Sequence, residues 1–102
     1  MRFSASTASS QRRARIRFLP TVKGGRSTPP VSGFRPQIRL DGVQTSCVVE
    51  SGDVGETFSF GVDSTVVLTL VFPDEYGHQF AELGRVELFE GNRLIATGDF
   101  LD

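Results

Sequence analysis

The chain has 102 residues, which is enough for one compact domain and too little for two independent cores. Hydrophobic residues make up 38% and charged residues 23% of the sequence, and the formal net charge is −1. This composition is typical of a soluble globular domain and excludes a disordered tail, a collagen and a membrane-spanning segment. The single cysteine, Cys47, cannot form a disulfide within the chain, so a reducing, cytoplasmic location is the default expectation.

The charges are distributed unevenly along the chain. Residues 1–40 contain nine basic residues and no acidic residue, whereas residues 41–102 contain all 12 acidic residues and two basic ones. A basic half indicates nucleic-acid binding, because arginine and lysine neutralise phosphates. The same pattern is explained by a basic strand whose charges pair with acidic strands of one sheet. The charge distribution alone leaves both interpretations open.

The first segment of the chain, residues 1–13, is rich in serine and arginine and contains no acidic residue. Such a composition cannot bury a core, so we expect a flexible basic arm. An organelle transit peptide is the alternative interpretation, because those peptides share this composition. The folded domain is then expected to comprise residues 14–102.

Apolar and polar residues alternate with a period of two in most of the chain from Ala14 onward, which is typical of β-strands. No window of 11 or more residues shows helical periodicity, and the polar segment 74–84 has room for one short turn of helix. The dipeptides Asp41-Gly42 and Gly91-Asn92 predict tight hairpin turns. The strands predicted in chain order cover residues 14–18, 35–40, 43–50, 58–62, 66–72, 85–90 and 93–101.

Roughly five to seven short strands joined by glycine- and proline-containing turns predict an all-β domain, folded as a small closed barrel or a sandwich. Four aromatic residues are expected in its core rather than as platforms for nucleobases, because they lie on apolar faces. These residues are Phe34, Phe58, Phe60 and Phe100.

The sequence offers few residues for catalysis. It has one cysteine and one histidine, so a metal site of His and Cys ligands cannot be assembled, and a nucleophile–base pair would require Cys47 and His78 to meet. Cys47 shares one face of its strand with Val43, Thr45 and Val49 and is expected to pack in the core. His78 lies in a polar segment and is expected to be solvated. The sequence has no phosphate-binding loop of the Gly-Lys-Ser/Thr type, so we expect no enzyme, no cofactor and no GTP-binding site.

The most specific motif of the chain lies in residues 23–37. Lys-Gly-Gly-Arg-Ser-Thr-Pro at 23–29 is followed by Gly-Phe-Arg-Pro-Gln at 33–37. This pattern resembles the loop and strand that open the C-terminal barrel domain, the third domain, of bacterial and organellar translation elongation factor Tu. Residues 66–73 resemble the long strand of that domain that ends in proline, and residues 89–98 resemble its final hairpin.

The resemblance implies a six-stranded antiparallel Greek-key barrel. In that family the domain packs on a GTPase domain and contacts the T-stem backbone of aminoacyl-tRNA. A sparse set of polar residues suffices for such a contact, because A-form RNA is recognised through its backbone and 2′-hydroxyl groups. The resemblance assigns RNA binding to Arg26, Ser27, Gln37, Ser46, Glu90, Gly91 and Arg93.

The sequence departs from the family pattern at two positions that face the RNA. Ser27 stands where the family has histidine, and Phe72 stands where it commonly has lysine. Arg35 is expected to be structural, as a salt-bridge partner at the start of a strand. Two functions stay open: binding of tRNA or another structured RNA, and a structural or protein-interaction module for a GTPase-like partner or a second copy. Clustered exposed arginines would favour RNA, whereas arginines paired with acidic residues would favour a protein.

Overall fold

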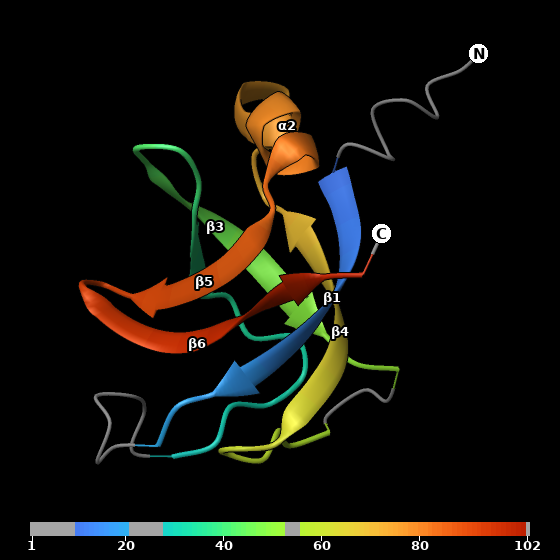
Figure 1. Ribbon diagram of the computed structural model, residues 1–102, viewed down its shortest axis with the longest axis vertical. Helices are drawn as coiled ribbons and strands as arrows, with labels where there is room; N and C mark the ends of the chain where they lie inside the picture. The colour runs from blue at the N-terminus through green and yellow to red at the C-terminus, as the bar shows by residue number, and fades with distance from the viewer. Residues whose placement is uncertain (1–9, 21–27, 53–55, 102) are drawn as a thin grey trace.

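The computed structural model describes residues 10–20, 28–52 and 56–101. In this part of the chain six strands close into an antiparallel barrel with the order β1-β4-β3-β2-β5-β6, and a helix lies at one end (Figure 1). β2, β3 and β4 are neighbours in antiparallel order, and β1 lies beside β4 rather than beside β2. This strand order confirms the predicted six-stranded Greek-key barrel. The elements are β1 (Gln11–Phe18), β2 (Gln37–Arg39), β3 (Gln44–Glu50), β4 (Asp63–Leu70), α2 (Pro73–Glu82), β5 (Arg85–Glu90) and β6 (Arg93–Phe100).

The first strand begins earlier than its alternating pattern predicts. Gln11 pairs in register with Thr69 of β4, and Arg13 pairs with Val67. The prediction that residues 11–13 belong to a flexible arm is therefore wrong, because these residues form ladder hydrogen bonds with β4. Residues 1–9, the rest of the predicted arm, lie outside the described residues.

The segment 58–62 alternates like a strand but does not form one. Its backbone is irregular, and Phe60 forms an isolated parallel bridge with Phe18 at the end of β1. The two hairpin turns are where the sequence predicts them. Gly42 and Gly91 have φ angles of 83° and 63°, which glycine adopts at little cost and other residues rarely adopt.

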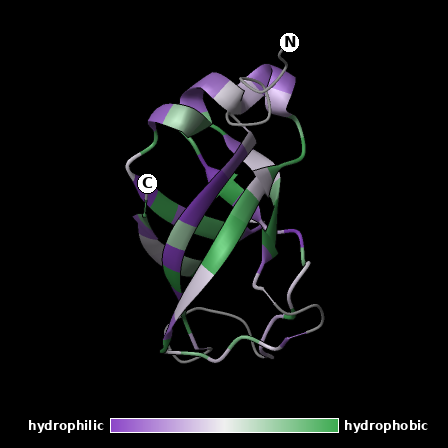
Figure 2. Ribbon diagram, turned by 90° about the vertical axis from the view of Figure 1, so that its right-hand side faces the viewer, coloured by the Kyte–Doolittle hydropathy of each residue, from purple (hydrophilic) through white to green (hydrophobic). Residues whose placement is uncertain are grey.

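The core fills the barrel with alternate residues of the strands. On β1, Ala14, Ile16 and Phe18 are fully buried, while the arginines between them are exposed. Figure 2 shows this side of the molecule, with the largely hydrophilic β1 beside the more hydrophobic β4. On β3, Cys47 and Val49 are fully buried, as predicted.

Aromatic rings close one end of the barrel. The ring centroids of Phe18 and Phe58 are 5.2 Å apart, and Phe34 lies 5.7 Å from Phe18. Phe58 is buried, as predicted, whereas Phe34, Phe60 and Phe100 are only partly buried and pack against the core from outside. The alternating pattern does not distinguish these partly buried rings from fully buried ones.

The helix α2 covers the other end of the barrel (Figure 1). It has ten residues, so the expectation of one short turn is wrong. Pro73 in its first turn and the acidic residues Asp74 and Glu75 favour a helix start. Its C-terminus has no basic residue of its own. Arg12 of β1 supplies a positive charge at this end of the helix. Its guanidinium donates hydrogen bonds to the carbonyl oxygens of Phe80 and Leu83, at 2.8 and 2.7 Å.

Candidate nucleic-acid interface

The outer face of β2 and β3 carries four polar side chains in two opposed pairs. Gln37 lies opposite Ser46 and Arg39 lies opposite Gln44 in the antiparallel register. The residue between them on β2, Ile38, is fully buried. Since neighbouring residues of a strand point to opposite faces, the four polar side chains share the outside of the barrel.

Hydrogen bonds connect this face to the turn between β5 and β6. The side-chain amide of Gln44 donates to the Oε1 atom of Gln37 at 3.0 Å and to the carbonyl oxygen of Gly91 at 3.3 Å. Gln37 also lies opposite Phe89 of β5. The β2–β3 hairpin therefore meets the β5–β6 turn, which is 47 residues further along the chain than Gln44. We call this place the hairpin surface and define it as Gln37, Arg39, Gln44, Ser46 and Gly91.

The structure brings together five of the seven residues to which the resemblance assigns RNA binding. Gln37, Ser46 and Gly91 belong to the hairpin surface, and Glu90 and Arg93 flank Gly91 as an opposed, exposed pair. The other two, Arg26 and Ser27, lie outside the described residues. The RNA-binding role of all seven stays a prediction.

Two residues of the hairpin surface were not among the predicted contacts. Gln44 and Arg39 follow the same period of two as Ser46 and Gln37. This period is the sequence signal that places them on the same face. Phe89 follows the buried Leu88 and lies on the outer face opposite Gln37. Its contact with Arg39 was not visible in the sequence, because the two residues come from separate strands. The guanidinium carbon of Arg39 lies 4.3 Å from the centroid of the Phe89 ring.

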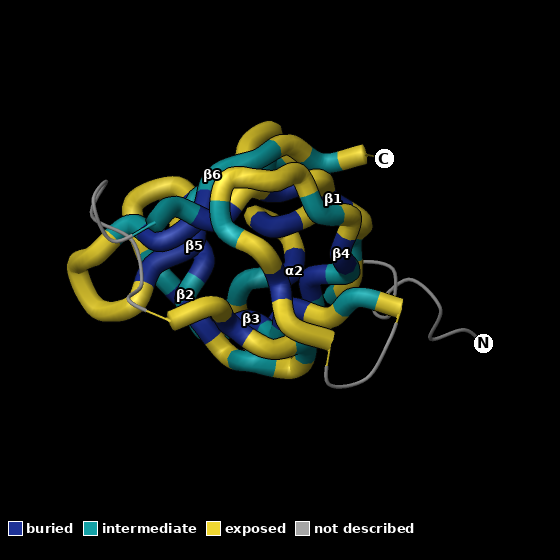
Figure 3. The backbone as a smooth tube through the Cα atoms, turned by 90° about the horizontal axis from the view of Figure 1, so that it is seen from below, coloured by how far each residue is buried: buried dark blue, intermediate teal, exposed yellow. Residues whose placement is uncertain are grey.

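The arginines of β1 lie on the opposite side of the barrel from β2. In the view from below, β1 and β4 lie on one side and β2 and β5 on the other (Figure 3). Arg15 and Arg17 are exposed on the outer face of β1, and Arg17 forms an ion pair with Asp63 at 3.1 Å. Arg15 lies opposite Asp99 of β6. The basic residues on this side are thus interleaved with acidic ones.

The expectation for Arg35 is not met. Arg35 is exposed and forms no ion pair with any residue that the structure describes. It precedes Pro36, whose side chain is buried. The proline, and not an arginine salt bridge, anchors this end of the loop to the barrel.

The structure separates Cys47 from His78. Cys47 is fully buried inside the barrel, and burial raises the pKa of its thiol to about 12, so it stays protonated near neutral pH. His78 lies on α2 with 88% of its side chain exposed, as predicted for a solvated residue, 3.6 Å from Glu82. The described residues contain no cluster of three or more His, Cys, Asp or Glu side chains that could hold a metal ion.

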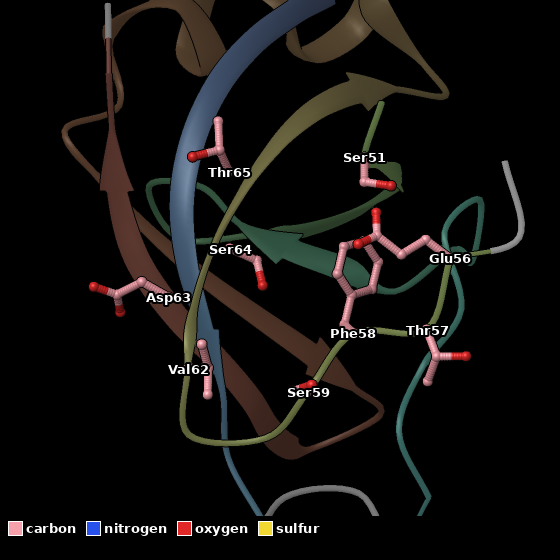
Figure 4. Close-up of a pocket in the computed structure, with 9 residues that line it drawn as sticks. All are labelled: Ser51, Glu56, Thr57, Phe58, Ser59, Val62, Asp63, Ser64 and Thr65. Carbon is pink, nitrogen blue, oxygen red and sulfur yellow. The ribbon is translucent and has the colours of Figure 1, made fainter. Parts of the chain in front are cut away.

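A separate hollow of about 300 Å³ lies beside the start of β4. Figure 4 shows the hydroxyl groups of Ser51 and Ser64 on either side of the Phe58 ring, with Glu56 and Asp63 at its edges. The hollow contains none of the residues to which the resemblance assigns RNA binding. In addition, the carboxylate of Asp63 is bound to Arg17.

The fold and the hairpin surface define a class of protein: a closed six-stranded antiparallel barrel domain with a polar surface where two hairpins meet. No protein-family model matches the chain. The chain is 36% identical over 89 residues to Elongation factor Tu 2 of Streptomyces avermitilis, an alignment that covers 83% of this chain and 20% of that protein. The resemblance found in the sequence is therefore confirmed, and the domain is elongation-factor-Tu-like.

The chain spans about one fifth of the length of this curated relative. The similarity thus concerns a single domain of a larger protein. No helix in residues 10–20, 28–52 or 56–101 is long and apolar enough to cross a membrane.

Proposed function

We propose that this domain binds tRNA or another structured RNA through the RNA backbone, in the cytoplasm and without enzymatic activity of its own. The observation that carries the proposal is the pair of hydrogen bonds from Gln44 to Gln37 and to Gly91. These bonds hold residues from three segments in one polar surface. The similarity to Elongation factor Tu 2 supports a role related to translation.

The hairpin surface suits an RNA backbone better than nucleobases. Amide and hydroxyl groups such as those of Gln37, Gln44 and Ser46 can both donate and accept hydrogen bonds, which matches phosphate oxygens and 2′-hydroxyl groups. No aromatic ring is exposed on this surface, since Phe89 is only 5% exposed. Binding by base stacking is therefore not expected here.

The test is fluorescence anisotropy of labelled tRNA, and of a duplex DNA of the same length, titrated with the purified domain over a series of salt concentrations. We expect saturable binding that is tighter for tRNA than for DNA. Gln37→Ala should weaken tRNA binding about three- to tenfold, which is the range expected for the loss of one hydrogen bond. Arg26→Ala should also weaken binding while the domain stays folded.

The matched control is Gln79→Ala, which makes the same change at an exposed position on α2. Its affinity for tRNA should equal that of the unchanged protein. Equal affinities for tRNA and DNA, or equal losses for Gln37→Ala and Gln79→Ala, would contradict the proposal.

One observation favours a second candidate function, a protein-interaction module. The ion pair between Arg17 and Asp63 and the opposition of Arg15 to Asp99 give the β1 side alternating charges. Such a pattern suits a protein with complementary charges better than a polyanion. Sedimentation of the domain alone tests the simplest form, association with a second copy. A monomer at all concentrations would exclude that form.

A further inference from the structure

Arg39 and Phe89 form a cation–π pair on the outside of the barrel. Phe89 lies opposite Gln37, so Arg39 reaches its ring along the diagonal between β2 and β5. The ring is only 5% exposed although it is on the outer face, and the guanidinium carbon lies 4.3 Å from its centroid. A guanidinium that stacks by its face keeps the N–H groups in its plane available for an acceptor. Phe89 thus places a charged group on the outer face of the barrel.

Arg39 differs in its partners from the arginines of β1. Arg17 is bound to a carboxylate, and Arg12 donates hydrogen bonds to two carbonyl oxygens at the end of α2. Arg39 is exposed and has no ion pair with an acidic residue in the described part of the chain. Its charge is therefore not neutralised within that part of the protein.

The space beside Arg39 is large enough for a phosphate group. A hollow of about 370 Å³ is lined by Arg39, Gly42, Val43 and Gln44. This volume is many times the roughly 10 to 15 Å³ that a cavity needs to hold one water molecule. Gln44 also lines this space, and its side-chain amide is held by hydrogen bonds to Gln37 and Gly91.

We propose that Arg39 is the principal phosphate-binding side chain of the hairpin surface and binds one phosphodiester group of the RNA backbone through two guanidinium N–H groups. The inference rests on the proposed function. It adds a cationic contact at a position that the family motif does not mark. The charge of Arg39 then offsets the departures at Ser27 and Phe72, where the family has histidine and commonly lysine.

The experiment measures tRNA affinity across a salt series for the full chain and for Arg39→Ala, Arg39→Lys and Arg15→Ala. Arg39→Ala should weaken binding about tenfold, as expected for a charged hydrogen-bonded contact. The slope of log affinity against log salt should fall by about 0.7 to 0.9, because one phosphate contact is lost. Arg39→Lys should keep the slope but bind about threefold more weakly, because an ammonium cannot form the bidentate contact.

Arg15→Ala is the matched control, because it removes the same charge from an exposed position on the opposite side of the barrel. It should change the affinity less than about twofold, since distant charges are screened by salt. Thermal unfolding of each variant checks that the fold is intact.

Three results would overturn the inference. The first is that Arg39→Ala binds tRNA as tightly as the unchanged protein does. The second is an equal loss for Arg39→Ala and Arg15→Ala, which indicates a general charge effect. The third is full affinity of Arg39→Lys, which contradicts the bidentate geometry. A lack of tRNA preference in the unchanged protein is a different result: it contradicts the proposed function itself and removes the basis of this inference.

Discussion

β1 and β2 lie on opposite sides of the barrel, and each carries arginine on its outer face (Figure 3). The arginines of β1 are interleaved with acidic residues of β4 and β6, and Arg17 is bound to Asp63. Arg39 of β2 lies on an aromatic ring instead. The density of arginine along a sequence is therefore a poor guide to an anion-binding surface. The partners of each arginine decide whether its charge is available to a ligand.

If the side of the barrel around β2 binds RNA and β1 contributes only to the fold, changes in β1 should alter the stability of the domain and not its affinity for tRNA. The largest effect is expected for Phe18→Ala, which should lower the free energy of unfolding by about 3 to 5 kcal/mol, because its ring is fully buried. Phe60→Ala should cost only about 1 to 2 kcal/mol, because Phe60 is partly buried. Denaturation in urea measures both, and equal losses would contradict the burial of the two rings.

The next effect concerns Arg12, the β1 residue that binds the C-terminal end of α2. Arg12→Ala should lower the free energy of unfolding by about 2 to 4 kcal/mol, because two hydrogen bonds to carbonyl oxygens and the stacking on Phe100 are lost. Arg13→Ala, at the exposed neighbouring position, is the control and should change stability by less than about 0.5 kcal/mol. A loss of tRNA affinity in folded Arg12→Ala would break the division between the two sides.

The smallest effect is expected for the ion pair between Arg17 and Asp63. Both side chains are about half exposed, so a double-mutant cycle with Arg17→Ala and Asp63→Ala should give a coupling energy of about 0.2 to 1 kcal/mol. The coupling should decrease in high salt. A coupling energy above about 2 kcal/mol would show that this surface is more tightly ordered than its exposure indicates.

Much of the fold is visible in the sequence, because strands with one buried face carry a clear period of two. Ile16 and Cys47 follow this period and are fully buried. The start of β1 is not visible, since Arg12 has the composition of an arm and its partners at the end of α2 are 68 and 71 residues away. The length of the helix is also hard to predict, because only Pro73 and the acidic residues that follow it mark its start and no helical periodicity marks its course.

The candidate site is predictable only in part, because its members come from separate segments. The family motif marks Gln37, and the final hairpin marks Gly91, but neither motif shows that the two residues meet. That contact depends on the pairing of β2 with β5 and on the side chain of Gln44. The contact between Arg39 and the Phe89 ring depends in turn on the pairing of β2 with β5, which alternation within one strand cannot reveal.

The most direct test of the account is a titration of the isotope-labelled domain with tRNA, followed by the shifts of its backbone amide signals in NMR spectra. We predict that the largest shifts map to residues 37–39, 44–46 and 90–93, with the signals of residues 13–17 unchanged. Shifts concentrated in residues 13–17 would contradict it, because RNA would then bind the β1 side of the barrel.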